Sequence, residues 1–132
     1  MKRRQFLAGS AVAGATGLAA AAGGHAAALD VAGLDAASSA SVVLHDKRIT
    51  LDPAIAQRLA GNGAQVIALT DDPVRLWRSE VGALLQQPDT RLFGVTLWAD
   101  YLIVRGLAAE SRRHVRHERH DAETGTFTWL IA

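Results

Sequence analysis

Residues 41–73 read SVVLHDKRITLDPAIAQRLAGNGAQVIALTDDP, and this stretch decides the fold. Two short apolar runs, 41–45 and 65–70, have the length and the β-branched content of buried strands. Between them, Asp52-Pro53 predicts the start of a helix, since Asp accepts hydrogen bonds from free N–H groups and Pro fits the first helical turn. The glycines at 61 and 63 predict its end. Strand, helix and strand in this order predict a right-handed crossover between parallel strands.

The same order continues toward the C-terminus. Asp72-Pro73 predicts a second helix, with an apolar stripe of period 3.6 that includes Trp77 and Val81. Residues 92–96 (LFGVT) predict a third strand, and a strongly apolar helix is expected from about 97 to 111. Thr96 is placed to cap that helix.

The last part of the chain predicts a β-hairpin. Residues 114–120 (HVRHERH) are polar, whereas 126–131 (TFTWLI) alternate, with Gly125 closing the turn between them. We expect Phe127, Trp129 and Ile131 to face the core, and Thr126 and Thr128 to face outward. The expected fold is α/β: a three-layer sandwich with a mainly parallel open sheet, in the order β-α-β-α-β-α-β-β, ending in an antiparallel hairpin.

The N-terminus has the pattern of an export signal. Arg3, Arg4, Phe6 and Leu7 match the twin-arginine consensus, and the stretch 8–24 that follows is almost wholly Ala, Gly, Val and Leu. So weakly apolar a stretch fits the twin-arginine route better than the general secretory route, and it is a poor membrane span. Small residues predict cleavage near Ala26 or Ala28. The expected organisation is a signal peptide over 1–28, a flexible linker over 29–41 and one α/β domain over 42–132.

Composition restricts the classes of partner. Three of the 14 Lys and Arg residues lie in the leader, so the remainder carries two more acidic than basic residues. That balance favours neither nucleic acid nor an anionic membrane as a partner, and we expect membrane contact only during export, through the twin-arginine translocase. The chain has no cysteine, which excludes a lipoprotein anchor, disulfides and thiolate chemistry.

A candidate binding site follows from the strand order. In open α/β sheets, ligands bind outside the carboxyl ends of the parallel strands. The polar residues that follow the three predicted strands there are candidates for ligand binding: His45, Asp46, Arg48, Asp71 and Asp100. A structural explanation is open for each of them, such as a solvated turn or a helix start.

Three histidines at 114, 117 and 120 suggest a metal site, but their spacing does not suit one. On a strand, His114 and His120 would share a face while His117 points away, and the interleaved arginines would repel a cation. No glycine-rich phosphate loop follows the first strand. We therefore expect neither a metal nor a cofactor, and an edge strand at 114–120.

Several segments together carry a resemblance. With the twin-arginine leader, the His-Asp turn after the first strand, residues 94–108 (GVTLWADYLIVRGLA) and 126–132 (TFTWLIA), the chain resembles small, uncharacterised exported proteins of proteobacteria. The resemblance implies export and a single α/β domain. It implies no activity and no role for any residue.

Two functions are therefore expected as alternatives. The first is a periplasmic accessory or binding protein that accompanies a larger exported protein, such as a redox enzyme. The second is a small-molecule-binding protein or small enzyme that uses the cleft at the strand ends. The first predicts a contiguous apolar surface patch, and the second predicts a concave pocket where the candidate residues converge.

Overall fold

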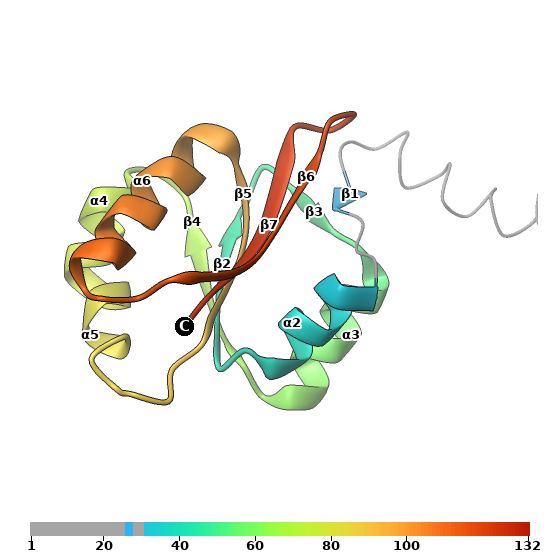
Figure 1. Ribbon diagram of the computed structural model, residues 1–132. Coiled ribbons are helices and arrows are strands. Elements are labelled where there is room, and N and C mark those ends of the chain that lie inside the picture. Colours follow the sequence, from blue (N-terminus) through green and yellow to red (C-terminus); the bar gives the residue numbers. More distant parts are fainter. Residues whose placement is uncertain (1–25, 28–30) are drawn as a thin grey trace, which may run out of the picture.

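The computed structural model describes Ala26–Ala27 and residues 31–132 (Figure 1). The predicted twin-arginine motif, with Arg3, Arg4, Phe6 and Leu7, lies outside the described residues. So does most of the predicted signal peptide. Ala26–Ala27, at the predicted cleavage region, form the short strand β1, which pairs in parallel with β3 (Thr50–Leu51).

The centre of the domain is a five-stranded sheet in the order β4-β2-β5-β7-β6. Its strands are β2 (Val42–Asp46), β4 (Gln65–Leu69), β5 (Leu92–Leu97), β6 (Val115–Asp121) and β7 (Thr126–Ile131). β2 lies between β4 and β5 and is parallel to both, while β7 pairs antiparallel with β5 and β6. The α/β class, the parallel core and the terminal hairpin are confirmed. The sheet is mixed rather than mainly parallel, because two of its strand pairs are parallel (β2–β4 and β2–β5) and two are antiparallel (β5–β7 and β6–β7).

The helices begin and end where local chemistry places them. α3 (Pro53–Asn62) starts at Asp52, whose Oδ1 accepts the N–H of Ala54 at 2.8 Å, and it ends at Gly63, where φ is 67°. The next helix starts at Asp72, whose Oδ1 accepts the N–H of Val74 at 2.9 Å. It runs without a break through α4 (Pro73–Leu76), a π-helical segment η1 (Trp77–Val81) and α5 (Gly82–Leu84). The last helix is α6 (Trp98–Glu110).

The prediction of a flexible linker over 29–41 is wrong for most of that segment. Val31–Ser39 form the helix α2, and Ala36, Ala37 and Ala40 are buried. The segment has only Leu29, Val31 and Leu34 as large apolar side chains and no clear apolar period, so its sequence resembles a linker. Its small alanines nevertheless let the helix pack closely against the sheet, beside α3.

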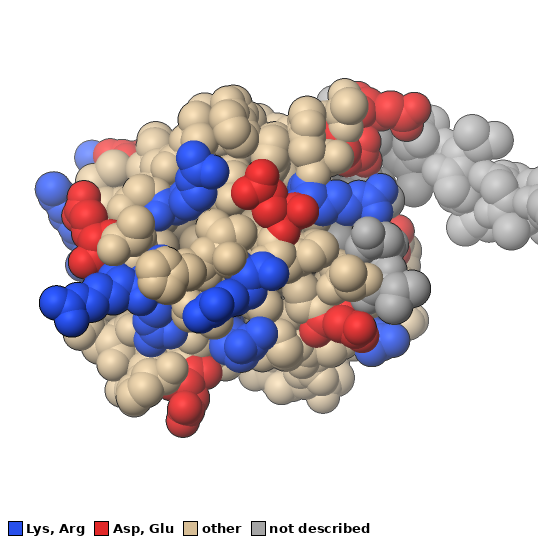
Figure 2. Space-filling view, in the orientation of Figure 1, with Lys and Arg blue, Asp and Glu red and all other residues tan. Residues whose placement is uncertain are grey.

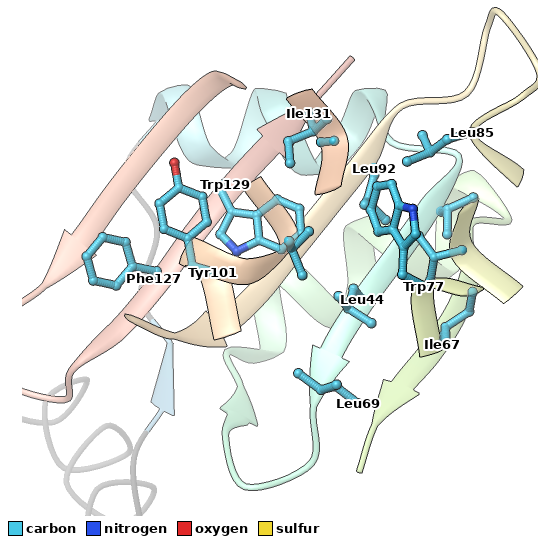
Figure 3. Close-up of a cluster of buried hydrophobic side chains, with 14 residues drawn as sticks. Leu44, Ile67, Leu69, Trp77, Leu85, Leu92, Tyr101, Phe127, Trp129 and Ile131 are labelled. Carbon is cyan, nitrogen blue, oxygen red and sulfur yellow. The ribbon is translucent and has the colours of Figure 1, made fainter. Parts of the chain in front are cut away.

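Helices cover both faces of the sheet (Figure 1). On one face, the helix of α4, η1 and α5 packs with α6 over a core that includes Trp77, Tyr101 and Trp129 (Figure 3). On the other face, α2 and α3 enclose a second core around Val43, Phe93 and Leu130. Among the residues described, no helix is long and apolar enough to cross a membrane.

The C-terminal strand β7 is buried on both sides. Phe127, Trp129 and Ile131 face the core with α6, as expected. The expectation that Thr126 and Thr128 face outward is wrong, since both are buried. Helix α2, which the sequence did not predict, contacts β7 and so helps to enclose it.

The hydroxyl of Thr96 binds Trp129 in the core instead of capping α6. Trp129 lies opposite Gly94 in the β5–β7 ladder, its indole ring covers Gly94, and its Nε1 donates to Thr96 Oγ1 at 3.0 Å. Thr96 is fully buried. The prediction that it caps α6 is wrong, because the N-cap residue of α6 is Leu97, and no side chain of the described residues makes a capping hydrogen bond there.

Candidate functional site

The carboxyl ends of the parallel strands enclose a hollow of about 510 Å³. Because β2, β4 and β5 run in the same direction, their ends meet at one edge of the sheet. The end of β2 and its following loop supply one part of the lining, the end of β4 a second, and the first turn of α6 a third. The lining residues are Asp46, Lys47, Arg48, Leu69, Thr70, Asp71 and Asp100.

An ion pair fixes the floor of this hollow. Asp46, the last residue of β2, is 1% exposed. Arg48 Nε donates to Asp46 Oδ1 at 3.0 Å, and Arg48 Nη2 donates to Asp46 Oδ2 at 2.6 Å. The backbone N–H of Arg48 also donates to Asp46 Oδ1 at 2.9 Å. A two-point guanidinium–carboxylate pair of this kind has little rotational freedom, so both groups are preorganised.

Arg48 also connects the end of β2 to the start of α6. The same Nη2 donates to Asp100 Oδ2 at 3.0 Å, so one guanidinium bridges two carboxylates that are 54 residues apart in sequence. Asp100 lies in the first turn of α6, where a carboxylate is also favoured by the helix dipole. The Arg48 side chain as a whole is 65% exposed and lines the hollow.

The two carboxyl groups have pKa values shifted in opposite directions. Burial acts to raise the pKa of Asp46, but the hydrogen bonds and charge of Arg48 outweigh it and lower that pKa below its ordinary value. Burial raises the pKa of Asp100, and the attraction of Arg48 does not fully offset this. Asp46 therefore holds its proton less readily than an exposed Asp does, while Asp100 takes one up more readily.

The structure brings four of the five predicted residues together and separates the fifth. Asp46, Arg48, Asp71 and Asp100 all line the hollow. His45 does not, because successive residues of a strand point to opposite faces and Asp46 occupies the α6 side. The His45 ring instead lies against the backbone, with Nε2 2.5 Å from the carbonyl oxygen of Ile49; a carbonyl can only accept, so this nitrogen carries the hydrogen.

Three lining residues were not selected from the sequence: Lys47, Leu69 and Thr70. Leu69 and Thr70 end the second apolar run, and Lys47 lies between two selected residues, so position in the strand-end loops was the signal that could have found them. Asp71 lies at the rim, with its side chain 76% exposed and 3.8 Å from Arg75.

The three histidines at 114, 117 and 120 do not come together in the structure. β6 carries His117 and His120 on opposite faces, with a break in register between Val115 and His117, and His120 stacks on Phe127 at 4.4 Å. Within the described residues, no group of three or more His, Cys, Asp or Glu side chains is arranged to hold a metal ion.

A second, aromatic hollow of about 410 Å³ lies between α6 and the terminal hairpin. Trp98, His120, Gly125 and Phe127 line it. Trp98 is 47% exposed, and the centroid of its ring lies 4.8 Å from that of the Phe127 ring. Leu102 and Ile103 of α6 are also exposed, so this helix presents large apolar side chains to solvent.

Comparisons of the chain with protein-family models, with curated proteins and with solved structures found no match.

Proposed function

We propose that this protein is an exported domain that binds a small polar molecule in the hollow at the carboxyl ends of β2, β4 and β5. The observation that carries the proposal is the convergence of Asp46, Arg48, Asp71 and Asp100 around about 510 Å³ of space. That volume is in the range of small-molecule sites, and its position is the one at which open α/β sheets bind ligands.

The lining favours a ligand that carries both charge signs or several hydroxyl groups. Arg48 binds both Asp46 and Asp100, so these three groups together carry one net negative charge. With Asp71 they present carboxylate acceptors at the hollow, and the Lys47 ammonium is a donor there. Thr70 adds a hydroxyl group there. A rigid ion pair at the floor lets these groups bind a ligand without first ordering the loop, which reduces the entropic penalty of binding.

An NMR screen of the full chain tests this proposal. Four probes represent the ligand classes: putrescine, glutamate, succinate and glucose. Saturable shifts of the backbone amides of Thr70, Asp71 and Asp100 are expected with a probe of the right class, and no shifts in the same titration of Asp71→Ala/Asp100→Asn. Saturable shifts confined to residues away from the hollow would exclude it as the site.

We also propose export by the twin-arginine route, on the basis of the sequence pattern around Arg3 and Arg4. Replacing both arginines by lysine keeps the charge of the leader but removes the paired guanidinium groups. Cell fractionation should find the wild-type chain shortened in the periplasm and the Arg3→Lys/Arg4→Lys chain uncleaved in the cytoplasm. Equal periplasmic amounts of both would exclude this route.

A second candidate function is that of an accessory protein that travels with a larger exported partner. The exposed apolar side chains of α6 favour it: Trp98 is 47% exposed, Leu102 36% and Ile103 39%. A photo-crosslinking amino acid at Leu102 should then capture one partner in producing cells. The same group at exposed Ala109, at the end of the same helix, should not. Equal capture at the two positions would exclude a specific surface on α6.

A further inference from the structure

The two edges of the sheet are protected to different degrees. At one edge, β6 carries exposed charged and polar side chains, among them Arg116, Glu118 and His120, and its register is broken near Val115. Both features discourage pairing with another strand. Figure 2 shows that charges of both signs are interspersed on the face of the molecule shown there. At the other edge, β4 has the sequence QVIAL, with no charge, proline or irregularity in its pairing.

The backbone of β4 has unpaired groups on its outer side. The N–H of Gln65 donates to the carbonyl oxygen of Ser41 at 3.0 Å, and the carbonyl oxygen of Leu69 accepts from the N–H of Lys47 at 3.3 Å. The odd-numbered residues of β4 therefore direct their backbone N–H and C=O groups toward β2. Val66 and Ala68 direct theirs away from the sheet, and in the described part of the chain β4 pairs with β2 alone. Val66 is also 54% exposed, an unusual position for a large apolar side chain on an edge strand.

We propose that β4 pairs antiparallel with β4 of a second copy of this chain, about a two-fold axis at Ile67. In this register Val66 lies opposite Ala68 of the second copy, and Ala68 opposite its Val66. Each of these is a hydrogen-bonded pair, so the outward N–H and C=O groups of both residues are satisfied in both copies. The pattern is self-complementary, as a two-fold interface requires. Two uncharged copies of this strand also do not repel each other.

The surroundings of β4 fit the same register. Gln65 of the second copy would lie opposite Leu69, on the face covered by α4. A hollow of about 220 Å³ lies there, lined mostly by polar residues: Ala68, Thr70, Asp71, Asp72, Arg75, Leu76 and Ser79. It offers hydrogen-bond partners to a glutamine side chain. Ile67 points into the core of its own copy and so leaves the two strands free to approach (Figure 3).

Mass and hydrogen exchange of the full chain test the proposal together. Light scattering should give twice the 14.0 kDa chain mass. In the dimer, the amides of Val66 and Ala68 should exchange as slowly as that of Ile67, which bonds to β2 in either state. A monomer at millimolar concentration, or rapid exchange at Val66 and Ala68 with slow exchange at Ile67, would overturn the proposal.

Substitutions at β4 distinguish this interface from any other. Ala68→Pro removes an N–H that β2 does not use, so the domain should fold and run as a monomer. Ala68→Ser keeps the N–H and should remain a dimer. Val66→Lys, at an exposed site, provides a second disrupting variant should proline perturb folding, and it should also give a monomer. A dimer that survives both Ala68→Pro and Val66→Lys would show that another surface is used and overturn the proposal.

Discussion

The guanidinium of Arg48 holds both carboxylate oxygens of Asp46, with Nε 3.0 Å from Oδ1 and Nη2 2.6 Å from Oδ2. This contact fixes the turn after β2 and sets the floor of the strand-end hollow. The buried carboxylate depends on it, whereas the guanidinium belongs to an exposed side chain and also binds Asp100. The consequences for stability are therefore asymmetric between the two residues.

Asp46→Ala should lower the free energy of unfolding by about 2 kcal/mol, because it removes charge-assisted hydrogen bonds to Arg48 at a buried position. Asp71→Ala is the matched control at the rim of the same hollow. Its carboxylate is exposed and its ion pair with Arg75 is long, so a change within about 0.5 kcal/mol is expected. Urea unfolding of both variants measures the difference. Equal effects would show that the Asp46 pair does not stabilise the turn.

The two carboxyl groups of the site should titrate on opposite sides of 3.8, the ordinary pKa of Asp. Asp46, with a lowered pKa, contributes stability that is present above that value and is lost as pH falls through its folded-state pKa. Asp100 has a raised pKa, so its ionisation disfavours the folded state, and Asp100→Asn should increase stability at pH 7. Carboxyl carbon NMR measures both midpoints; the reverse order would contradict the roles assigned to burial and Arg48.

Gly94→Ala should prevent stable folding. A Cβ at position 94 would lie 1.9 Å from Cζ2 of Trp129, a ring that is itself fully buried and bonded to Thr96. Gly106→Ala is the control: a Cβ there meets no described heavy atom within 4 Å, and alanine in helix α6 should stabilise by roughly 0.5–1 kcal/mol. Thermal unfolding followed by circular dichroism compares the two. If Gly94→Ala unfolded cooperatively at the same temperature as the wild type, the close contact between position 94 and the Trp129 ring would be contradicted.

Tyr101 should ionise only in strong base. Burial, followed by the hydrogen bond that its hydroxyl donates to Glu118, raises its pKa to about 12. It is the single tyrosine of the chain, so ultraviolet absorbance reports it alone. Glu118→Gln should lower the midpoint while burial keeps it above 10.0. A wild-type midpoint near 10.0, with circular dichroism showing an intact fold, would contradict this environment.

The sequence predicted those helices whose ends are set by strong local signals. Asp52-Pro53, Asp72-Pro73 and Gly63 set helix ends through their own backbone and side-chain chemistry, so those boundaries did not depend on the rest of the fold. Helix α2 has no such signal. Its stability comes from packing alanines against the sheet, which is a property of the assembled domain.

The hollow was predicted to a similar extent. The rule for strand ends selected the edge of the sheet at which the hollow lies, and four of its candidates, Asp46, Arg48, Asp71 and Asp100, line it. It could not separate His45 from Asp46, because adjacent residues of a strand differ only in the face they occupy. Nor could it show that Arg48 connects Asp46 to Asp100, since that contact depends on how α6 sits over the end of β2.

The binding of a small molecule in the strand-end hollow is the central claim, and mass spectrometry of molecules released from the protein tests it most directly. The chain is isolated from producing cells as wild type, as Asp71→Ala/Asp100→Asn and as Arg78→Ala, an exposed control away from the hollow. The wild type and the control should release the same small polar compound in proportion to protein, and the double variant should not. Release of that compound in equal amounts from all three proteins, or from none, would contradict the assignment.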